Sequence, residues 1–440
     1  MTKSNKRPNH FLVKRVWLSL FCLSSLFGRA SEVPEPVIPA GVGVNIHFVT
    51  GHQNELDLIQ AAGFKFVRMD FAWTAIERTK GTYDWHEYEE LLDNLDKHGL
   101  RAVLILDYSH PLYETSVTCT NPMNNQLHTS IAAPQHPESI AAFVRWATAG
   151  VQHFRGRHVL WEIWNEPNIE FWSPKGDAQQ YATLALTVCK SIRSTAPDAT
   201  IIGPATSTLP WDFLETVFKA GALEYLDAVS VHPYRRPNRP PESAAVDFHK
   251  LRELIEQYAP ESRKDKIPIL SGEWGYSSFT KGVSIETQAA FAVRQQLSNL
   301  LEGVPLSIWY DWKNDGDDPK ENEHNFGTVF PDLKPKPAYI ALQTMTRQLS
   351  GYRVARRLPL ESDQDYALLC TSDNGPQKVA AWTIGDARTV NLNVSGKDMA
   401  VLQLVSGKGE VSSGKVNSGK LALELTELPQ YVTLGEGEAR

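Results

Sequence analysis

The sequence predicts a mixed α/β fold, a closed (β/α)8 TIM barrel followed by a small C-terminal antiparallel β-sandwich domain. Between residues 41 and 351, eight short runs rich in β-branched and aromatic residues alternate with patterns of helical spacing. After Gly351 the helical patterns stop, and only short alternating strands remain. Repeated strand–helix units favour a parallel barrel, whereas strands alone favour a sandwich.

The barrel strands are expected where β-rich runs end in loops: at residues 41–48, 65–71, 101–108, 159–164, 200–205, 227–234, 267–274 and 305–312. Helical spacing is clearest at residues 88–99, 178–197, 286–303 and 334–351. Each of these helical patterns ends near a glycine or a proline, which are typical helix stops. An open doubly wound sheet is the alternative, but no glycine-rich phosphate loop follows the first strand.

The sequence pattern of the tail, after Gly351, differs from that of the barrel. Its expected strands are short, alternate in polarity and are separated by Gly, Asp and Asn: 366–372, 378–385, 389–394, 400–407, 420–426 and 430–434. We therefore expect the barrel to cover residues 31–350 and the β domain to cover residues 351–440.

The first thirty residues resemble an export signal. A basic start precedes the apolar run 16–27, and the small residues Gly28 and Ala30 follow it. We expect cleavage after Ala30 and a periplasmic or secreted protein. An uncleaved anchor is the alternative, although the run is shorter than the ~20 residues of a spanning helix. No other stretch is long and apolar enough to span a membrane.

Composition narrows the range of partners. The 440 residues carry a formal charge of -7 without a basic tail after the N-terminus, which argues against a nucleic-acid partner and favours a neutral one. After signal removal Cys119, Cys189 and Cys370 remain, an odd and widely spaced set without disulfide or metal-site spacing. We expect a monomer without metal or cofactor. The acidic run 315–324 lacks the ligand spacing of a calcium loop, so we expect a solvated loop there.

Two glutamates stand at strand ends. Glu166 lies in "WEIWNEPNIEFW" just past the fourth strand, and Glu273 ends the seventh in "ILSGEWGYSS". Strict alternation would put Glu273 on one inward face with Ile269 and Ser271. The carboxyl ends of barrel strands meet at one mouth, so the two glutamates should face each other there. Two facing carboxylates are what glycoside hydrolysis requires, and the aromatic surround suits both a protonated acid and a sugar.

Other acids also end barrel strands: Asp70, Asp107 and Asp311. Glu162 lies deeper on the strand that leads to Glu166. We expect it to form an ion pair with Arg68, which should point inward on the second strand together with Phe66 and Asp70.

"WNEPN" after a fourth strand and "GEWG" at the end of a seventh resemble the acid/base and nucleophile signatures of the clan A glycoside hydrolases. The segments 62–85 and 324–342 are similar to glycoside hydrolase family 39 and its relatives, which include bacterial exopolysaccharide-degrading endoglycosidases with a barrel and a small β domain. The resemblance covers residues 41–350 and implies a retaining double displacement. In that mechanism Glu166 is the general acid/base and Glu273 the nucleophile.

The resemblance also implies the substrate-binding residues. Asn165 is expected to hydrogen-bond the sugar 2-hydroxyl. Arg68 and Tyr234 are expected to orient the carboxylate of Glu273, with His232 beside them.

The resemblance further implies that a tryptophan of the eighth strand, Trp309 or Trp312, floors the sugar site, and a core-packing role for one of the two remains open. The remaining polar candidates could line the cleft or make structural hydrogen bonds: Asn45, His47, Asp107 and His110.

Taken together, these features predict an exported retaining β-glycosidase that acts on an oligo- or polysaccharide, within an exopolysaccharide or cell-wall glycan. One alternative is a carbohydrate-binding or polysaccharide-assembly protein without hydrolysis, and another is a transglycosylase that uses the same residues. The sugar, the linkage and endo or exo action depend on the loops 109–135 and 235–246, which the sequence pattern does not resolve.

Overall fold

Eight parallel strands close into a barrel in the computed structural model, in the order β1-β10-β9-β8-β7-β6-β3-β2. The structure describes residues 1–2, 32–120, 125–395, 399–434 and 438–439, so the expected signal segment and its cleavage site lie outside the described residues. Each strand overlaps an expected run: β1 (Val42–Asn45), β2 (Phe66–Ala72), β3 (Arg101–Asp107), β6 (Leu160–Ile163), β7 (Thr200–Ser207), β8 (Ala228–His232), β9 (Ile269–Trp274) and β10 (Ser307–Trp309).

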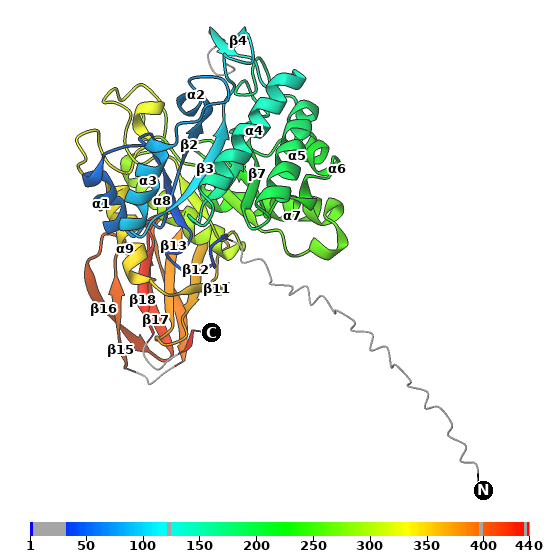
Figure 1. The fold of residues 1–440 in the computed structure, drawn as a ribbon. Helices are drawn as coiled ribbons and strands as arrows, with labels where there is room; N and C mark the ends of the chain where they lie inside the picture. The colour runs from blue at the N-terminus through cyan, green and yellow to red at the C-terminus, as the bar shows by residue number, and fades with distance from the viewer. Residues whose placement is uncertain (3–31, 121–124, 396–398, 435–437, 440) are drawn as a thin grey trace. The chain divides into compact units, whose positions relative to one another are not determined.

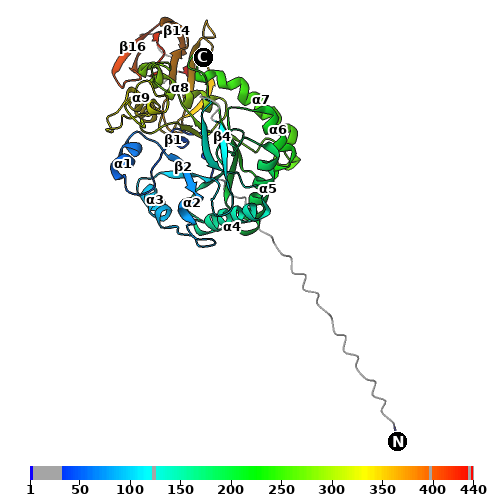
Figure 2. The same cartoon turned by 90° about the horizontal axis from the view of Figure 1, so that it is seen from above.

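Helices surround the strands, as the view from above shows (Figure 2). They are α1 (Gln53–Ala61), α2 (Trp73–Ile76), α3 (His86–Lys97), α4 (Pro137–His153), α5 (Ala178–Thr195), α6 (Trp211–Lys219), α7 (Ala245–Tyr258), α8 (Ile285–Leu301) and α9 (Pro337–Gln348). Side-chain caps fix two of the starts. Asp177 accepts from the backbone N–H of Gln179 and Gln180 before α5, and Ser284 accepts from Thr287 before α8. Within the described ranges, no helix has both the length and the apolar composition needed to cross a bilayer.

The loop after β3 contains a hairpin that the sequence analysis treated as irregular. Strands β4 (Ser116–Thr120) and β5 (Leu127–Ile131) pair antiparallel and project from the barrel in Figure 1. Their residues are mostly exposed, so the pattern lacked the buried alternation by which strands are recognised.

The barrel interior is filled below its mouth. One buried cluster joins inward side chains from the strands: Phe66, Val103, Leu160, Ile202, Ala228, Leu270, Leu306 and Ile308. This packing is typical of a TIM barrel, in which the interior is a core and the carboxyl ends of the strands carry the site.

The seventh barrel strand corrects one expectation. Leu270 belongs to the interior cluster, and a Cβ added to Gly272 would lie 2.2 Å from Ser230 Oγ and 3.1 Å from Glu162 Oε1, so Leu270 and Gly272 point inward. Ile269 and Ser271 therefore point outward, contrary to the sequence-based prediction. The register between β9 and β10 shifts after Ser271, which lets Glu273 face the barrel mouth as well.

The tail forms one antiparallel sheet in the order β11-β12-β13-β18-β15-β16-β17-β14-β19. The strands are β11 (Arg353–Arg357), β12 (Asp365–Thr371), β13 (Lys378–Thr383), β14 (Arg388–Ser395), β15 (Val401–Val405), β16 (Val411–Asn417), β17 (Lys420–Leu425), β18 (Gln430–Thr433) and β19 (Glu438–Ala439). The sheet curls around a core of its own that joins Leu369 of β12 to Leu392 of β14 and Leu423 of β17. The predicted fold class, a barrel followed by a small antiparallel β domain, is confirmed; β11, β16 and β19 were not expected.

Polar side chains join the barrel to the sheet. Arg294 of α8 forms a two-pronged ion pair with Glu242, at 2.7 and 2.8 Å, and the indole N–H of Trp382 on β13 donates to the same carboxylate at 2.7 Å. Helix α8 is buried on most sides because strands of the barrel and of the tail both pack against it.

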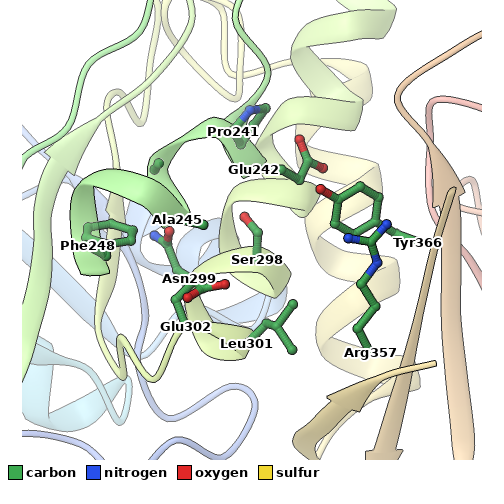
Figure 3. A pocket seen from close by; sticks show the side chains of 11 residues that line it. Pro241, Glu242, Ala245, Phe248, Ser298, Asn299, Leu301, Glu302, Arg357 and Tyr366 are labelled. Carbon is green, nitrogen blue, oxygen red and sulfur yellow. The ribbon is translucent and has the colours of Figure 1, made fainter. Parts of the chain in front are cut away.

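A cavity of about 110 Å³ lies along this junction (Figure 3). Its walls come from the 3-10 helix Pro241–Ala244, the start of α7, the end of α8 and two strands of the tail: Pro241, Glu242, Ala244, Ala245, Phe248, Ser298, Asn299, Leu301, Glu302, Arg357 and Tyr366. It shares none of the expected site residues, so the candidate active site has to be sought at the barrel mouth.

Candidate active site

Arg68 is the centre of a buried polar network in the barrel. Its Nε donates to Glu162 Oε2 at 2.7 Å, its Nη1 to Glu273 Oε2 at 2.5 Å and its Nη2 to Asn165 Oδ1 at 2.8 Å. Ser230 Oγ donates to the other oxygen of Glu162. Burial would lower the pKa of Arg68, but the carboxylates of Glu162 and Glu273 outweigh it and raise that pKa. The expected Arg68–Glu162 ion pair is thus present, and its geometry fixes the guanidinium.

Glu273 is held from both sides. Arg68 binds one carboxylate oxygen, and Tyr234 OH donates to the other at 2.8 Å. Burial raises the pKa of Glu273, but the positive charge that His232 can carry, the charge of Arg68 and the two hydrogen bonds together hold it below its usual value. Glu273 is therefore an oriented carboxylate that stays ionised.

Glu166 is presented by a strained turn. Trp164 has a φ of 66° and Glu166 a φ of 47°, in the left-handed region that non-glycine residues rarely adopt. The backbone N–H of Trp164 donates to Leu106 O at 3.2 Å and that of Glu166 to Ala205 O at 2.9 Å, which anchors the turn to both neighbouring strands. Strain of this kind costs about 1–3 kcal/mol per residue and is common at functional sites.

His232 links the two halves of the site. Its Nε2 lies 3.3 Å from Arg68 Nη2, and its Nδ1 lies 3.0 Å from Glu166 Oε1. An arginine can only donate, so in the neutral ring Nε2 is the acceptor and Nδ1 carries the hydrogen that faces Glu166. The side-chain partners of the two glutamates therefore differ: Glu273 binds two strong donors, whereas Glu166 binds one imidazole.

The two glutamates converge. One oxygen of Glu166, one nitrogen of His232 and one oxygen of Glu273 all lie within 4.8 Å of one another. Such a trio could hold a metal ion. However, the guanidinium of Arg68 contacts both Glu273 and His232, and its positive charge would repel a second cation bound there. The arrangement suits acid–base and nucleophilic chemistry between two carboxyl groups.

Two aromatic residues beside Glu166 escaped the sequence analysis. Tyr108 OH accepts from Asn165 Nδ2 at 2.8 Å, and its ring lies 5.9 Å from that of Phe171. Phe171 is 42% exposed, which is unusual for a phenylalanine five residues beyond a buried glutamate. The aromatic flank of "WNEPNIEFW" was the available signal for Phe171.

The structure does not place Trp309 or Trp312 in the cleft. Trp309 is fully buried and donates to Phe326 O at 3.2 Å, and Trp312 is also buried and donates to Glu55 Oε2 at 2.7 Å. The reason is alternation: Leu306 and Ile308 point into the barrel, so Trp309 points outward. Both tryptophans pack in the core.

Alternation instead directs Tyr310 toward the mouth. Its ring is half-buried. Burial, the largest effect, and the negative charges of Asp311 and Glu273 all raise the pKa of Tyr310. Counting on from Ile308 in steps of two would have identified Tyr310 in the sequence.

The remaining candidates separate into two kinds. His47 Nε2 lies 3.1 Å from Asp311 Oδ2 in the mouth, and this contact raises the pKa of His47 to about 9. Asn45 accepts from Arg68 at 3.3 Å and so belongs to the central network. His110 is structural, since its ring contacts Glu77 O at 2.8 Å and Leu112 N at 3.0 Å.

Comparison with known proteins adds independent findings. The family model "Cellulase (glycosyl hydrolase family 5)" matches residues 37–316, and a search of curated protein sequences gave no significant match. A family 39 glycoside hydrolase from the gut symbiont Bacteroides cellulosilyticus WH2 is similar in structure, with a TM-score of 0.76, 26% identity, and coverage of 92% of this chain and 83% of that one.

Two further structures share the fold. A monomeric β-xylosidase from Caulobacter crescentus CB15 has a TM-score of 0.64 at 17% identity and covers 89% of this chain and 95% of its own. A family 30 endoxylanase from Clostridium papyrosolvens C71 has a TM-score of 0.62 at 12% identity, with coverage of 92% and 98%. The chain belongs to the cellulase family, glycosyl hydrolase family 5, and is a clan A glycoside hydrolase whose fold resembles that of the family 39 enzymes.

Proposed function

We propose that the chain is a retaining β-glycosidase in which Glu273 is the nucleophile and Glu166 the general acid/base. The observation that carries this proposal is the approach of the two carboxyl groups, whose nearest oxygens lie within 4.8 Å. Retaining glycosidases place the two groups about 5–5.5 Å apart, whereas inverting enzymes need about 6.5–9.5 Å to admit a water. This spacing supports direct attack by one carboxylate.

The difference between the two environments supports the division of roles. A nucleophile has to be ionised. Burial raises the pKa of Glu273, but the charges of His232 and Arg68 and the hydrogen bonds from Tyr234 and Arg68 outweigh it and hold that pKa below the usual value. An acid/base has to exchange a proton in each half-reaction. Glu166 Oε1 has one side-chain partner, the Nδ1 of His232 at 3.0 Å, and among the described residues no arginine or lysine contacts its carboxyl group.

The reaction then follows in two steps. Glu273 attacks the anomeric carbon while Glu166 gives its proton to the leaving oxygen, which forms a glycosyl ester and releases the aglycone. Glu166, now a carboxylate, removes a proton from water, and the resulting attack breaks the ester and restores Glu273. Two inversions at one carbon leave the product with the β-configuration of the substrate.

Proton NMR of the first product formed tests this mechanism. The wild-type protein, with a β-linked xylan or glucan as the probe, should release the β-anomer first, with the α-anomer appearing only as mutarotation proceeds. An α-anomer formed first would overturn the assignment of Glu273 as nucleophile.

We extend the proposal to the substrate and the location. Cleavage within an exopolysaccharide or cell-wall glycan is supported by the resemblance in the two segments 62–85 and 324–342, and sizing of early products distinguishes it from release of terminal sugars. We also propose an exported monomer with a mature N-terminus at Ser31, supported by the basic and apolar pattern of residues 1–30. N-terminal sequencing of exported material and size-exclusion chromatography with light scattering test these two points.

A further inference from the structure

Phe171 is an exposed aromatic residue that has no part in the proposed mechanism. It lies in the loop between β6 and α5, five residues beyond Glu166, and is 42% exposed, whereas its neighbour Trp172 is 1% exposed. A single exposed apolar side chain is common on protein surfaces, so only the surroundings of the ring can indicate a function.

The backbone holds Phe171 in a fixed place relative to Glu166. Glu166 O accepts from the N–H of Ile169 at 3.2 Å, and Ile169 O accepts from the N–H of Trp172 at 3.0 Å, so two successive turns connect Glu166 to the ring. The indole N–H of Trp164 donates to Phe171 O at 3.2 Å and ties the loop back to its start. These bonds involve no atom of the phenyl ring, so the side chain can be replaced while the loop keeps its anchors.

The hairpin of β4 and β5 supports the far end of the same loop. Ser173 Oγ donates to Ser130 Oγ at 2.9 Å, and Ser173 O accepts from the N–H of Ala133 at 2.8 Å. The loop is therefore held at Glu166 and again at Ser173, with Phe171 between the two anchors. A ring held in this way loses little conformational entropy when a ligand packs on it.

Tyr108 connects the exposed ring with the centre of the site. Its ring lies 5.9 Å from that of Phe171, tilted by 58°, and 5.7 Å from that of Trp164, nearly perpendicular to it. Its hydroxyl accepts from Asn165, which in turn accepts from Arg68. The aromatic surface of Phe171 and Tyr108 thus continues directly from the network that holds the nucleophile.

The strand order places this surface on the leaving-group side. Tyr108 follows β3, and in the closed order of the barrel β3 lies four strands away, in either direction, from β9, which carries Glu273. The loop with Phe171 follows β6, the strand next to β3, and the same loop carries Glu166. In the proposed mechanism Glu273 attacks the anomeric carbon and Glu166 protonates the leaving oxygen, so the group that departs lies toward β6 and β3.

We propose that Phe171 is the platform for the sugar on the leaving-group side of the bond that is cleaved, with Tyr108 flanking it. A β-linked pyranose presents C–H groups on its faces, which pack on an aromatic ring, while the hydroxyls around its edge stay hydrated. The inference rests on the proposed function for the roles of Glu166 and Glu273. It also defines the substrate class: the leaving group is itself a sugar, so the substrate is an oligo- or polysaccharide rather than the glycoside of a small alcohol.

Substrates that differ in the leaving group test the platform. The probes are β-1,4-xylotetraose against β-xylobiosyl fluoride and β-1,4-cellotetraose against β-cellobiosyl fluoride, because fluoride leaves without a sugar that could touch Phe171. In the series with the higher wild-type rate, Phe171→Ala should lose roughly tenfold or more in kcat/KM on the tetraose, as for removal of an aromatic anchor, and much less on the fluoride. Phe171→Tyr keeps the ring and should retain most of the wild-type kcat/KM on both.

Two outcomes would contradict the proposal. Equal losses on tetraose and fluoride in Phe171→Ala would mean that the ring acts on the attacked sugar or on the fold. A wild type that hydrolyses the fluorides but neither tetraose would mean that a sugar leaving group gains nothing from the ring. Ile384→Ala, which removes an exposed apolar side chain from the tail, is the matched control and should leave the ratio of the two kcat/KM values unchanged.

Failure of the proposed function has a different signature. Turnover of a fluoride by Glu273→Ala at the wild-type rate would overturn the assignment of the nucleophile. The platform is measured instead by the ratio of kcat/KM on the tetraose to that on the fluoride, in Phe171→Ala with Glu273 intact, and this ratio reports contacts of the leaving group.

Discussion

Arg68 shows how one buried charge can define the roles of its neighbours. Arg68 is only 1% exposed, and burying its charge without a partner would cost too much free energy. Glu162 accepts a hydrogen bond from its Nε, and Glu273 accepts one from its Nη1. The deeper carboxylate is capped by Ser230 and has no access to the mouth. The shallower one shares Arg68 with the cleft, so it is the carboxylate that can both stay ionised and reach a substrate.

At the residue scale the two catalytic assignments give different kinetic outcomes. Glu273→Ala should reduce turnover to background with every substrate, because no glycosyl ester can form. Glu166→Ala should lose about 10²–10⁴-fold on substrates with poor leaving groups and much less on dinitrophenyl glycosides, which need little proton donation. Steady-state rates on matched glycosides of both kinds provide the measurement.

Azide supplies the control for this pair. Added azide should attack the ester in Glu166→Ala without base assistance, raise its rate and give a β-glycosyl azide, while Glu273→Ala should give no β-azide. Wild-type turnover in Glu273→Ala would exclude it as the nucleophile.

The His47–Asp311 pair gives a pH-dependent prediction. The hydrogen bond to Asp311 is the largest effect on His47 and raises its pKa to about 9, while burial raises the pKa of Asp311 to about 6. Both groups are therefore charged between about pH 6 and pH 9. NMR titration of the imidazole should show a midpoint near 9 in the wild type, and Asp311→Asn should return it toward the ordinary 6.5.

Because the pKa of His47 is raised in the folded state, protonated His47 stabilises the fold at low pH. The folded state binds this proton more tightly than the unfolded state, so the contribution of His47 is complete below about pH 6.5 and is lost as the pH rises through about 9. The side chain is half exposed, so solvent screening keeps the effect small. An unchanged imidazole midpoint in Asp311→Asn would mean that the two side chains do not pair in solution.

At the scale of elements, the sequence predicted the strands and helices that follow a regular hydrophobic period. It failed to predict side-chain directions where that period is interrupted. All eight barrel strands and four helices were recognisable, since buried strands and amphipathic helices leave regular patterns. Glu273 was placed at the mouth for the wrong reason, because the register shift in β9 turns it there although Ile269 and Ser271 point outward. The floor of the sugar site was expected at Trp309 or Trp312 because residue type was given more weight than register, and both side chains are buried.

Gly272 is where that irregular strand is most constrained. A methyl group there would meet Ser230 Oγ at 2.2 Å and Glu162 Oε1 at 3.1 Å, both in the buried network. Gly272→Ala should lower the free energy of unfolding by about 1–3 kcal/mol, the usual cost of overpacking. It should also lower kcat, because Glu273 is the next residue. Urea denaturation and steady-state kinetics measure the two effects.

A double variant checks the cause. Ser230→Ala removes the atom that the new methyl group would strike, so the double variant should be less destabilised than the sum of the single changes. Strict additivity would show that Gly272→Ala acts in some other way than through this contact.

At the scale of the whole molecule, the buried carboxylate of Glu242 is one of the polar links between the barrel and the tail. Glu242 receives two hydrogen bonds from Arg294 and one from Trp382, all in a buried setting. Trp382→Phe keeps an aromatic ring against Tyr366, at 5.0 Å, but removes the donor. We expect a loss of about 1.5–3 kcal/mol in the free energy of unfolding, as for a hydrogen bond to a charged group.

Trp146 offers the matched control for this change, since its buried indole N–H has no partner. Trp146→Phe therefore reports the cost of the smaller ring alone, and Trp382→Phe should exceed it when both are measured by chemical denaturation. Equal losses would show that the bond to Glu242 adds nothing.

The same junction predicts how the chain responds to removal of the tail. A chain that ends at Gly351 would lose the packing of β11 on α8, and Arg294 and Glu242 would lose Trp382 and Glu427 as partners. None of the residues around Arg68 would be removed, so any folded fraction should still release the β-anomer first. We expect poor solubility, because the truncation would expose side chains of α8 that are buried in the full chain. Sedimentation of the expressed protein and NMR of its products test both parts. A soluble, stable truncation with an altered cleavage pattern would show that the tail shapes the substrate cleft as well as covering the barrel.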